Sequence, residues 1–359
     1  MADAARIPLW AWAVPALGCG MLVTTIFTGA TGALAAADVA AMVGAVFAAV
    51  YHAEVVAHRI GEPFGTLVLA VAVTVIEVAL IVSVMVGASG DKAGLARDTV
   101  FASVMIAGNG IVGLSLLLGG MRHHEQDFQI QAASAGLAVL AALTTLTLIL
   151  PNVTTSEAGP VFSTSQLAFA GTVSLVLYGS FVFVQTVRHR DYFLSTESAL
   201  DAHAVPPSGP VALLSAGLLL AALVAVVGLA KSLTPMLEMG VTWLDAPEAV
   251  VGIVIASLVM LPEGLSALRA ARANRLQTSL NLALGSALAS IGLTIPAVAV
   301  VSIVLQQALD LGLGPKDEVL LALTLFVGVI TLGTGRTTVL QGLVHLVIFA
   351  AFLFLAAVP

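Results

Sequence analysis

The chain alternates long apolar stretches with short polar joints. Each stretch is close to the ~20 residues that a helix needs to cross the hydrocarbon core of a bilayer. We find eleven such stretches, at residues 8–29, 36–58, 65–87, 98–120, 131–151, 164–187, 211–232, 246–268, 278–306, 318–335 and 338–357. Transmembrane β-strands are shorter and alternate in polarity. The pattern therefore predicts an all-α polytopic membrane protein with eleven transmembrane helices.

The longest polar joint, at residues 188–210, is rich in proline and divides the chain near its middle. We interpret it as a cytoplasmic linker. Residues 1–30 form a tail and a leading span, and five spans lie on each side of the linker, within 31–187 and 211–359. Because five is odd, the second set enters the membrane with the opposite orientation. This predicts an inverted five-plus-five repeat.

The distribution of arginine and lysine predicts the orientation, because cytoplasmic loops are enriched in both. With a cytoplasmic N-terminus and an outer C-terminus, the inside carries Arg6, Arg59, Arg122, Arg188, Arg190, Arg269, Arg272, Arg275 and Arg336. The outside then carries only Lys92, Arg97 and Lys316. The compact loops and the lack of sorting motifs suit a bacterial plasma membrane.

Composition supports the membrane interpretation and excludes several classes. Of 359 residues, 59% are hydrophobic and 9% are charged, against about 25% charged in a soluble domain. No basic stripe suggests nucleic acid, and the single Cys19 excludes a disulfide framework. The expected partners are the lipid bilayer and inorganic cations, and the sequence does not fix an oligomeric state.

Two acids lie inside apolar stretches at matching positions of the two halves. Segments 61–77 and 247–263 each begin near a glutamate, Glu62 or Glu248, and each ends fifteen residues later at Glu77 or Glu263. An ionised acid at the bilayer centre costs at least ~2.5 kcal/mol and usually has a function. We therefore expect Glu77 and Glu263 to form one shared site that binds a metal cation or protons.

Further oxygen atoms could complete such a site, since Ca²⁺ takes six to eight oxygen ligands. Thr74 precedes Glu77 by three residues and offers a hydroxyl, whereas Met260 precedes Glu263 and offers only a thioether, which prefers soft metals. The spans that follow the acids add Ser103, Asn109, Ser286 and Ser290. The alternative for these four is hydrogen bonding between helices.

Three ionisable residues are candidates for a proton relay or a cation entrance. Glu54 lies near His52 at the end of a span, Asp98 begins the next span but one, and Lys231 lies at the end of a later one. Glu54 could instead cap its helix, Asp98 could be an N-cap, and Lys231 could snorkel to the membrane surface.

Motifs for other chemistry are absent from the sequence. It has no Walker A loop, no HExxH and no GxSxG motif, so we expect neither an ATP-driven pump nor an enzyme, and no cofactor. The run from His123 to Asp127 resembles a metal cluster, but it lies in a predicted cytoplasmic loop without further ligands. A membrane enzyme using His123, His124 and Glu125 is therefore a low-ranked alternative.

Four segments resemble bacterial Ca²⁺/H⁺ antiporters of the ChaA type, within the Ca²⁺/cation antiporter superfamily. They are His52-Ala53-Glu54, residues 61–77, Leu261-Pro262-Glu263-Gly264-Leu265, and residues 277–296. The resemblance implies eleven helices, with the last ten as an inverted repeat. It also implies that Glu77 and Glu263 are the acids of the two α-repeats, which bind the cation and are protonated in turn.

One departure from the superfamily pattern bears on the transported ion. The superfamily has Gly-Asn-Ala-x-Glu in both α-repeats, whereas the asparagine positions here hold Thr74 and Met260. The working hypothesis is a secondary antiporter that exchanges Ca²⁺ for H⁺ by alternating access. Exchange of Na⁺ or K⁺ for H⁺ on the same site remains the main alternative, and a cation channel ranks below both.

Overall fold

A computed structural model describes residues 7–30, 32–61, 64–87, 93–193, 206–243, 247, 249–307 and 309–358. Ten helices within these ranges are long and apolar enough to cross a membrane. The protein is therefore an integral membrane protein of the polytopic all-α class, as predicted. Glu62 and Glu248, which open the two matching segments, lie outside the described residues, as does most of the predicted linker.

The predicted span at 318–335 corresponds to α14 (Pro315–Leu332), which is not among these ten helices. Its first turn carries Lys316, Asp317 and Glu318, so its start is too polar for an unbroken apolar span. The total of eleven spans therefore stays a prediction.

The chain forms two compact units, each built from segments of both predicted halves. Unit 1 comprises residues 1–92 and 204–246, and unit 2 comprises residues 93–203 and 247–359. Neither unit matches a predicted repeat, since each unit is built from two separate segments of the chain. The two units are described separately below.

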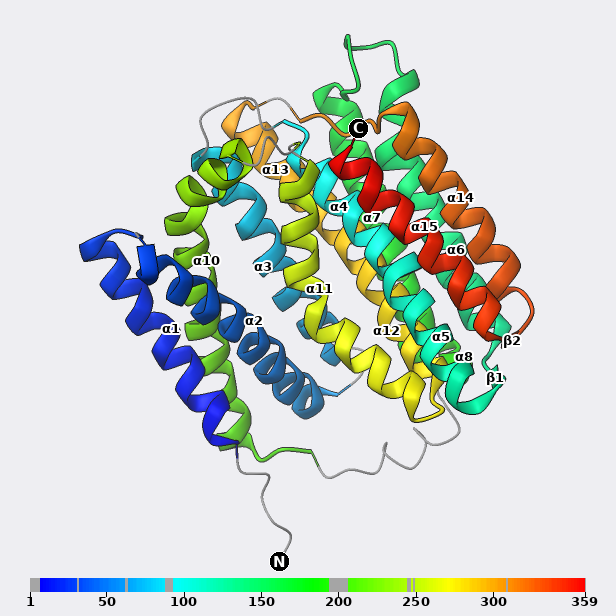
Figure 1. Cartoon of the computed structure of the whole chain (residues 1–359), viewed down its shortest axis with the longest axis horizontal. Helices are drawn as coiled ribbons and strands as arrows, with labels where there is room; N and C mark the ends of the chain where they lie inside the picture. The colour runs from blue at the N-terminus through cyan, green and yellow to red at the C-terminus, as the bar shows by residue number, and fades with distance from the viewer. Residues whose placement is uncertain are drawn as a thin grey trace, which may run out of the picture. The chain divides into compact units, whose positions relative to one another are not determined.

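The described part of unit 1 is a bundle of four helices in which glycine allows close contact. They are α1 (Leu9–Thr28), α2 (Gly32–Ile60), α3 (Phe64–Gly87) and α10 (Gly209–Trp243). Helices α1, α2 and α10 lie side by side (Figure 1). A Cβ atom on Gly18 of α1 would lie 3.0 Å from the Ala225 side chain of α10 and 3.6 Å from that of Ala45 of α2. Small residues thus bring the three helices together, as is typical in membranes.

Glycines with positive φ end two of these helices. Gly29 follows α1 with φ of 79°, and Gly61 follows α2 with φ of 76°. Only glycine adopts such angles without strain, so both turns are encoded locally.

Unit 2 contains the remaining elements of the described residues. Its α-helices are α4 (Leu95–Met105), α5 (Val112–His123), α6 (Ile130–Thr144), α7 (Thr164–Phe183), α8 (Arg190–Phe193), α11 (Ala249–Arg272), α12 (Leu276–Ala289), α13 (Ile295–Leu305), α14 and α15 (Val339–Ala357). A 3₁₀ turn, η3 (Leu150–Val153), ends the span that begins with α6. The strands β1 (Gln126–Asp127) and β2 (Arg336–Thr337) pair antiparallel. Ser115 of α5 and Ser279 of α12, both fully buried, share a hydrogen bond of 2.9 Å in the core.

Four spans of unit 2 contain a π-helical turn. These turns are η1 (Ile106–Ile111), η2 (Thr145–Ile149), η4 (Val184–Arg188) and η5 (Ser290–Thr294). By contrast, α11 continues through Pro262 without interruption. Turns η1 and η5 interrupt the spans that follow the two acid-bearing helices. Asp98 and Asn281 each lie five residues before a serine, Ser103 or Ser286. Matching them shifts the chain by 183 residues and places η1 opposite 289–294. This agreement is what a repeat would produce.

Two antiparallel backbone pairings connect loops of the two halves within unit 2. Strand β1, before α6, pairs with β2, before α15. Val161, before α7, forms an isolated bridge with Asp310, before α14. The predicted repeat matches the segment before α6 with the one before α14, and the segment before α7 with the one before α15. Each antiparallel pairing is then the counterpart of the other, as the predicted repeat requires.

Candidate ion-binding site

The first acid is held by α3 of unit 1. Glu77 is 1% exposed, and Thr74 on the same face of the helix is 8% exposed. The Thr74 hydroxyl has no hydrogen-bond partner within the described residues. Since a buried hydroxyl normally finds a partner, this oxygen is a candidate ligand beside the Glu77 carboxylate. Helix α3 packs against α2 and α10, which fixes both side chains within unit 1.

The second acid is held by α11 of unit 2. Glu263 is half-buried, while Met260 on the same face is 2% exposed. Helix α11 packs tightly against α4 and η1. A Cβ atom on Gly252 would lie 2.8 Å from backbone atoms of Asp98 and Thr99, and one on Gly264 would lie 3.2 Å from Ile111. Two glycines on α11 therefore set how closely the Glu263 helix approaches α4 and η1.

The other predicted ligands all lie in unit 2, on two spans that contact each other and α11. Ser103 lies on α4 and is 1% exposed, and Ser290 begins η5 and is 6% exposed. Ser286 on α12 is half-buried. Because α4 packs against η5, the structure brings Ser103 and Ser290 into the same helix cluster as Glu263. Each nevertheless stays a predicted ligand.

Asn109 on η1 is buried in a hydrogen-bond network with α14 and α15. Its Nδ2 atom donates to Thr324 Oγ1 at 2.8 Å, and its Oδ1 atom lies 3.0 Å from His345 Nδ1. His345 Nε2 lies 2.9 Å from Thr331 Oγ1. A neutral His345 with its proton on Nδ1 satisfies both contacts if Thr331 donates to Nε2. Both ends of the Asn109 amide are thus engaged in joining three spans.

Replacing Asn109 with Ala is expected to destabilise the protein by about 1–3 kcal/mol, because His345 Nδ1 and Thr324 lose a buried partner. Thermal unfolding in detergent without added cation checks this. Gln129→Ala also removes a side-chain amide, but at an exposed position. It is the control and should unfold like the wild type. A higher KM for the transported cation, at an unchanged unfolding temperature, would instead make Asn109 an ion ligand.

The three relay candidates have different surroundings. Glu54 is exposed on α2, whereas the neighbouring His52 is fully buried, with Nε2 2.8 Å from the Ala11 carbonyl of α1. Asp98 pairs with Arg97 at 2.8 Å. Lys231 is exposed on the face of α10 that also carries Leu220 and Val224. This placement suits a side chain that snorkels.

The loop after α5 connects structural elements rather than gathering metal ligands. Gln126 is 2% exposed, and its Nε2 donates to the Ala271 carbonyl and to Asn274 Oδ1. Asp127 pairs with Arg336 at 3.1 Å. Within the described residues, no group of three His, Cys, Asp or Glu side chains is placed to hold a metal ion.

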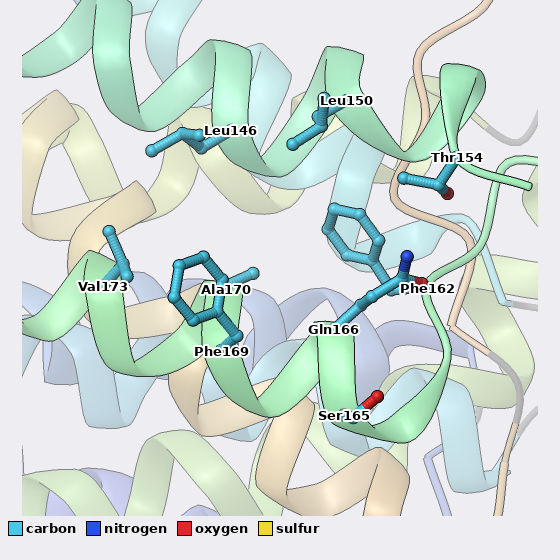
Figure 2. A pocket seen from close by; sticks show the side chains of 9 residues that line it. All are labelled: Leu146, Leu150, Thr154, Phe162, Ser165, Gln166, Phe169, Ala170 and Val173. Atoms are coloured by element: carbon cyan, nitrogen blue, oxygen red, sulfur yellow. The ribbon is translucent and has the colours of Figure 1, made fainter. Parts of the chain in front are cut away.

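An apolar cavity lies between the α6 and α7 spans, and none of the predicted site residues lines it (Figure 2). It has a volume of about 230 Å³ and is lined by Leu146, Leu150, Thr154, Phe162, Ser165, Gln166, Phe169, Ala170 and Val173. Phe169 is 67% exposed and Leu150 39%. No charged side chain lines this cavity, so it offers no carboxylate to a cation.

One buried acid is missing from the residues predicted above. Asp38 of α2 is fully buried and accepts a hydrogen bond from Thr25 of α1. Asp38 is the third residue of the predicted span 36–58. An acid so near the end of a span is usually interpreted as a residue of the membrane–water interface, so it was not predicted as functional. Its presence within an apolar stretch was the available signal.

Comparison with known proteins places the chain among cation transporters. The chain is 52% identical over 360 residues to the y4hA protein of Sinorhizobium fredii, covering 99% of this chain and 98% of that protein. It is 37% identical to the sodium-potassium/proton antiporter ChaA of Escherichia coli, covering 86% and 84%. A Ca²⁺/H⁺ antiporter ChaA of Bacillus subtilis is 23% identical, covering 56% and 57%.

Solved structures share the fold. The Ca²⁺/H⁺ antiporter protein YfkE matches with a TM-score of 0.74 at 15% identity, covering 97% of this chain and 99% of that one. The H⁺/Ca²⁺ exchanger CAX matches with a TM-score of 0.67 at 16% identity, covering 96% and 87%. The family described as sodium/calcium exchanger protein matches residues 19–187 and 214–358. With most of its length matched, the chain belongs to the sodium/calcium exchanger protein family.

Proposed function

We propose that the protein exchanges a cation for H⁺ by alternating access, with Glu77 and Glu263 as the residues that bind the cation or protons. The observation that carries the proposal is the burial of Glu77 inside an apolar span, on a helix that the predicted repeat matches with the one carrying Glu263. Such acids in corresponding helices of a transporter typically serve one ion site.

In the proposed cycle, both carboxylates are ionised when the cation binds from one side. Two carboxylates that share one cation repel each other once it has left, which favours uptake of protons. The protonated pair is neutral and can pass through the low-dielectric interior. Glu54 and Asp98 are proposed to serve proton or cation entry, and Ser103, Ser286 and Ser290 to add oxygen ligands.

Ca²⁺ is the first candidate for the exchanged cation, and Na⁺ or K⁺ is the second. The second is favoured by Met260, which is buried beside Glu263 and supplies no oxygen. The ChaA relative of Escherichia coli is described as a sodium-potassium/proton antiporter, while that of Bacillus subtilis is described as a Ca²⁺/H⁺ antiporter.

Proteoliposomes loaded with a pH-sensitive dye test the proposal. External Ca²⁺, Na⁺ and K⁺ are added separately, and proton release from the lumen is measured for each. An antiporter moves protons whenever its cation is added, even when the membrane potential is clamped. Cation entry without proton movement would favour a channel and reject the proposal.

We further propose that the N-terminus is cytoplasmic and the C-terminus outside, in a bacterial plasma membrane. In a Cys19→Ala background, a cysteine at the exposed Glu157 should react with a membrane-impermeant maleimide added to whole cells. A cysteine at the exposed His124 should react only after the cells are opened. The reverse labelling would overturn the orientation.

A further inference from the structure

Asp38 is a buried carboxylate that the proposed exchange does not use. It lies on α2 of unit 1 and is fully buried. The hydroxyl of Thr25, on the leading helix α1, lies 2.8 Å from each of its two carboxylate oxygens. Within the described residues, no basic side chain forms an ion pair with Asp38.

This environment suits a carboxyl group that gains and loses a proton. A buried carboxylate without a cation is costly, whereas the protonated acid is not. The Thr25 hydroxyl can donate to the ionised form and accept from the protonated form. Because its oxygen is equidistant from both carboxylate oxygens, rotation about the hydroxyl bond serves either state without moving the helices.

Helix α2, which carries Asp38 and His52, packs against α3, which carries Glu77. Near the start of α3, a Cβ atom on Gly65 would lie 2.6 Å from the Ala57 carbonyl oxygen of α2. Asp38 lies fourteen residues from His52, about 21 Å along the axis of α2.

The other titratable groups around Asp38 leave it without a counter-charge. On α1 the titratable group is Cys19, whose Sγ–H donates a hydrogen bond to the Ala221 carbonyl oxygen. Helix α3 offers Glu77, and α10 offers Lys231 on its exposed face. Along α2 itself, the nearest such groups are Tyr51, His52 and Glu54, near its far end.

We propose that Asp38 is a second proton-binding residue of the exchanger, held in place by Thr25 of the leading helix. It takes a proton from water at the α1–α2 end of unit 1, and the Asp38 O–H bond then breaks as the proton passes through water to the Glu77 carboxylate. This inference rests on the proposed function, because it needs Glu77 to accept protons in each cycle. It also gives α1 a role in transport.

Infrared difference spectra of the purified protein, recorded between low and high pH, test the protonation directly. We expect a carbonyl stretch of a protonated carboxylic acid that is lost in Asp38→Asn and retained in Glu77→Gln. Identical pH-difference spectra for Asp38→Asn and the wild type would overturn the proposal.

Transport in proteoliposomes provides the second measurement. Asp38→Asn is expected to slow cation-driven proton flux several-fold and to remove its dependence on pH at one face of the membrane only. An unchanged pH profile, in a preparation in which Glu77→Gln is inactive, would reject the role of Asp38 and leave the proposed function standing. Retained flux in Glu77→Gln would reject the proposed function, and the infrared result would still stand by itself.

Substitutions of Thr25 leave the Asp38 carboxylate in place. They therefore test the proposal even if Asp38→Asn does not fold. Thr25→Val removes the hydroxyl at nearly constant shape, and Thr25→Ser restores it. We expect Thr25→Val to shift the frequency of the Asp38 carbonyl stretch and the pH profile of flux, and Thr25→Ser to match the wild type. A Thr25→Val protein that matches the wild type in both measurements would contradict the proposal.

Discussion

Replacing Glu77 with Gln is expected to abolish cation-driven proton flux in proteoliposomes. The amide keeps the size of the side chain and its capacity for hydrogen bonds, but it cannot ionise, so it neither attracts the cation nor carries a proton. Because Glu77 is 1% exposed on α3, the substitution removes a buried charge from this span. The dye assay described above should therefore show only the leak of empty vesicles.

Glu263→Gln on α11 should have the same effect if the two acids serve one site, since each half of the cycle needs both charges. Glu157→Gln, which removes an exposed acid from the loop before α7, is the matched control and should transport at the wild-type rate. Glu77→Gln protein that folds, inserts and still exchanges cations for protons would refute the proposed mechanism.

Replacing Gly252 with Ala is expected to cause the second-largest loss of flux. The added Cβ atom would lie 2.8 Å from the backbone of Asp98 and Thr99, where no flexible side chain can move aside. Helix α11 must therefore shift away from α4 and carry Glu263 with it. An ion site tolerates little displacement of a carboxylate, so flux should fall even if the protein inserts normally.

Gly285→Ala on α12 is the control for this substitution. A Cβ atom there would meet nothing within 4 Å, so flux and thermal unfolding should match the wild type. Proton flux and unfolding temperature are measured for both variants. Wild-type flux in Gly252→Ala would mean that the contact between α11 and α4 does not position Glu263.

The apolar stretches predicted the helical class because the bilayer imposes a length on every span. Their ends were less predictable. The predicted span 211–232 belongs to α10, which continues to Trp243 although Lys231 and Pro235 mark a change in composition. Helices extend beyond the hydrocarbon core when packing supports them, and hydropathy alone does not register this.

The candidate site was predicted in part. Acids within apolar stretches identify Glu77 and Glu263, because a charge is costly at that depth. The π-helical turns η1 and η5 could not be predicted, since they depend on packing between spans and leave no pattern in the sequence. The same holds for the engagement of Asn109 with His345, whose positions are 236 residues apart.

The composition of the two compact units has a consequence for biosynthesis. Unit 1 needs α10 to complete a bundle begun by α1, α2 and α3, and unit 2 needs α11–α15 to cover α4–α7. Neither core can close while only the first half of the chain has left the ribosome. The first helices must therefore wait in the membrane with their small-residue faces uncovered, and misassembly is most damaging during this interval. The same interdependence means that the two halves, expressed as separate chains, would each lack the partner that completes its packing.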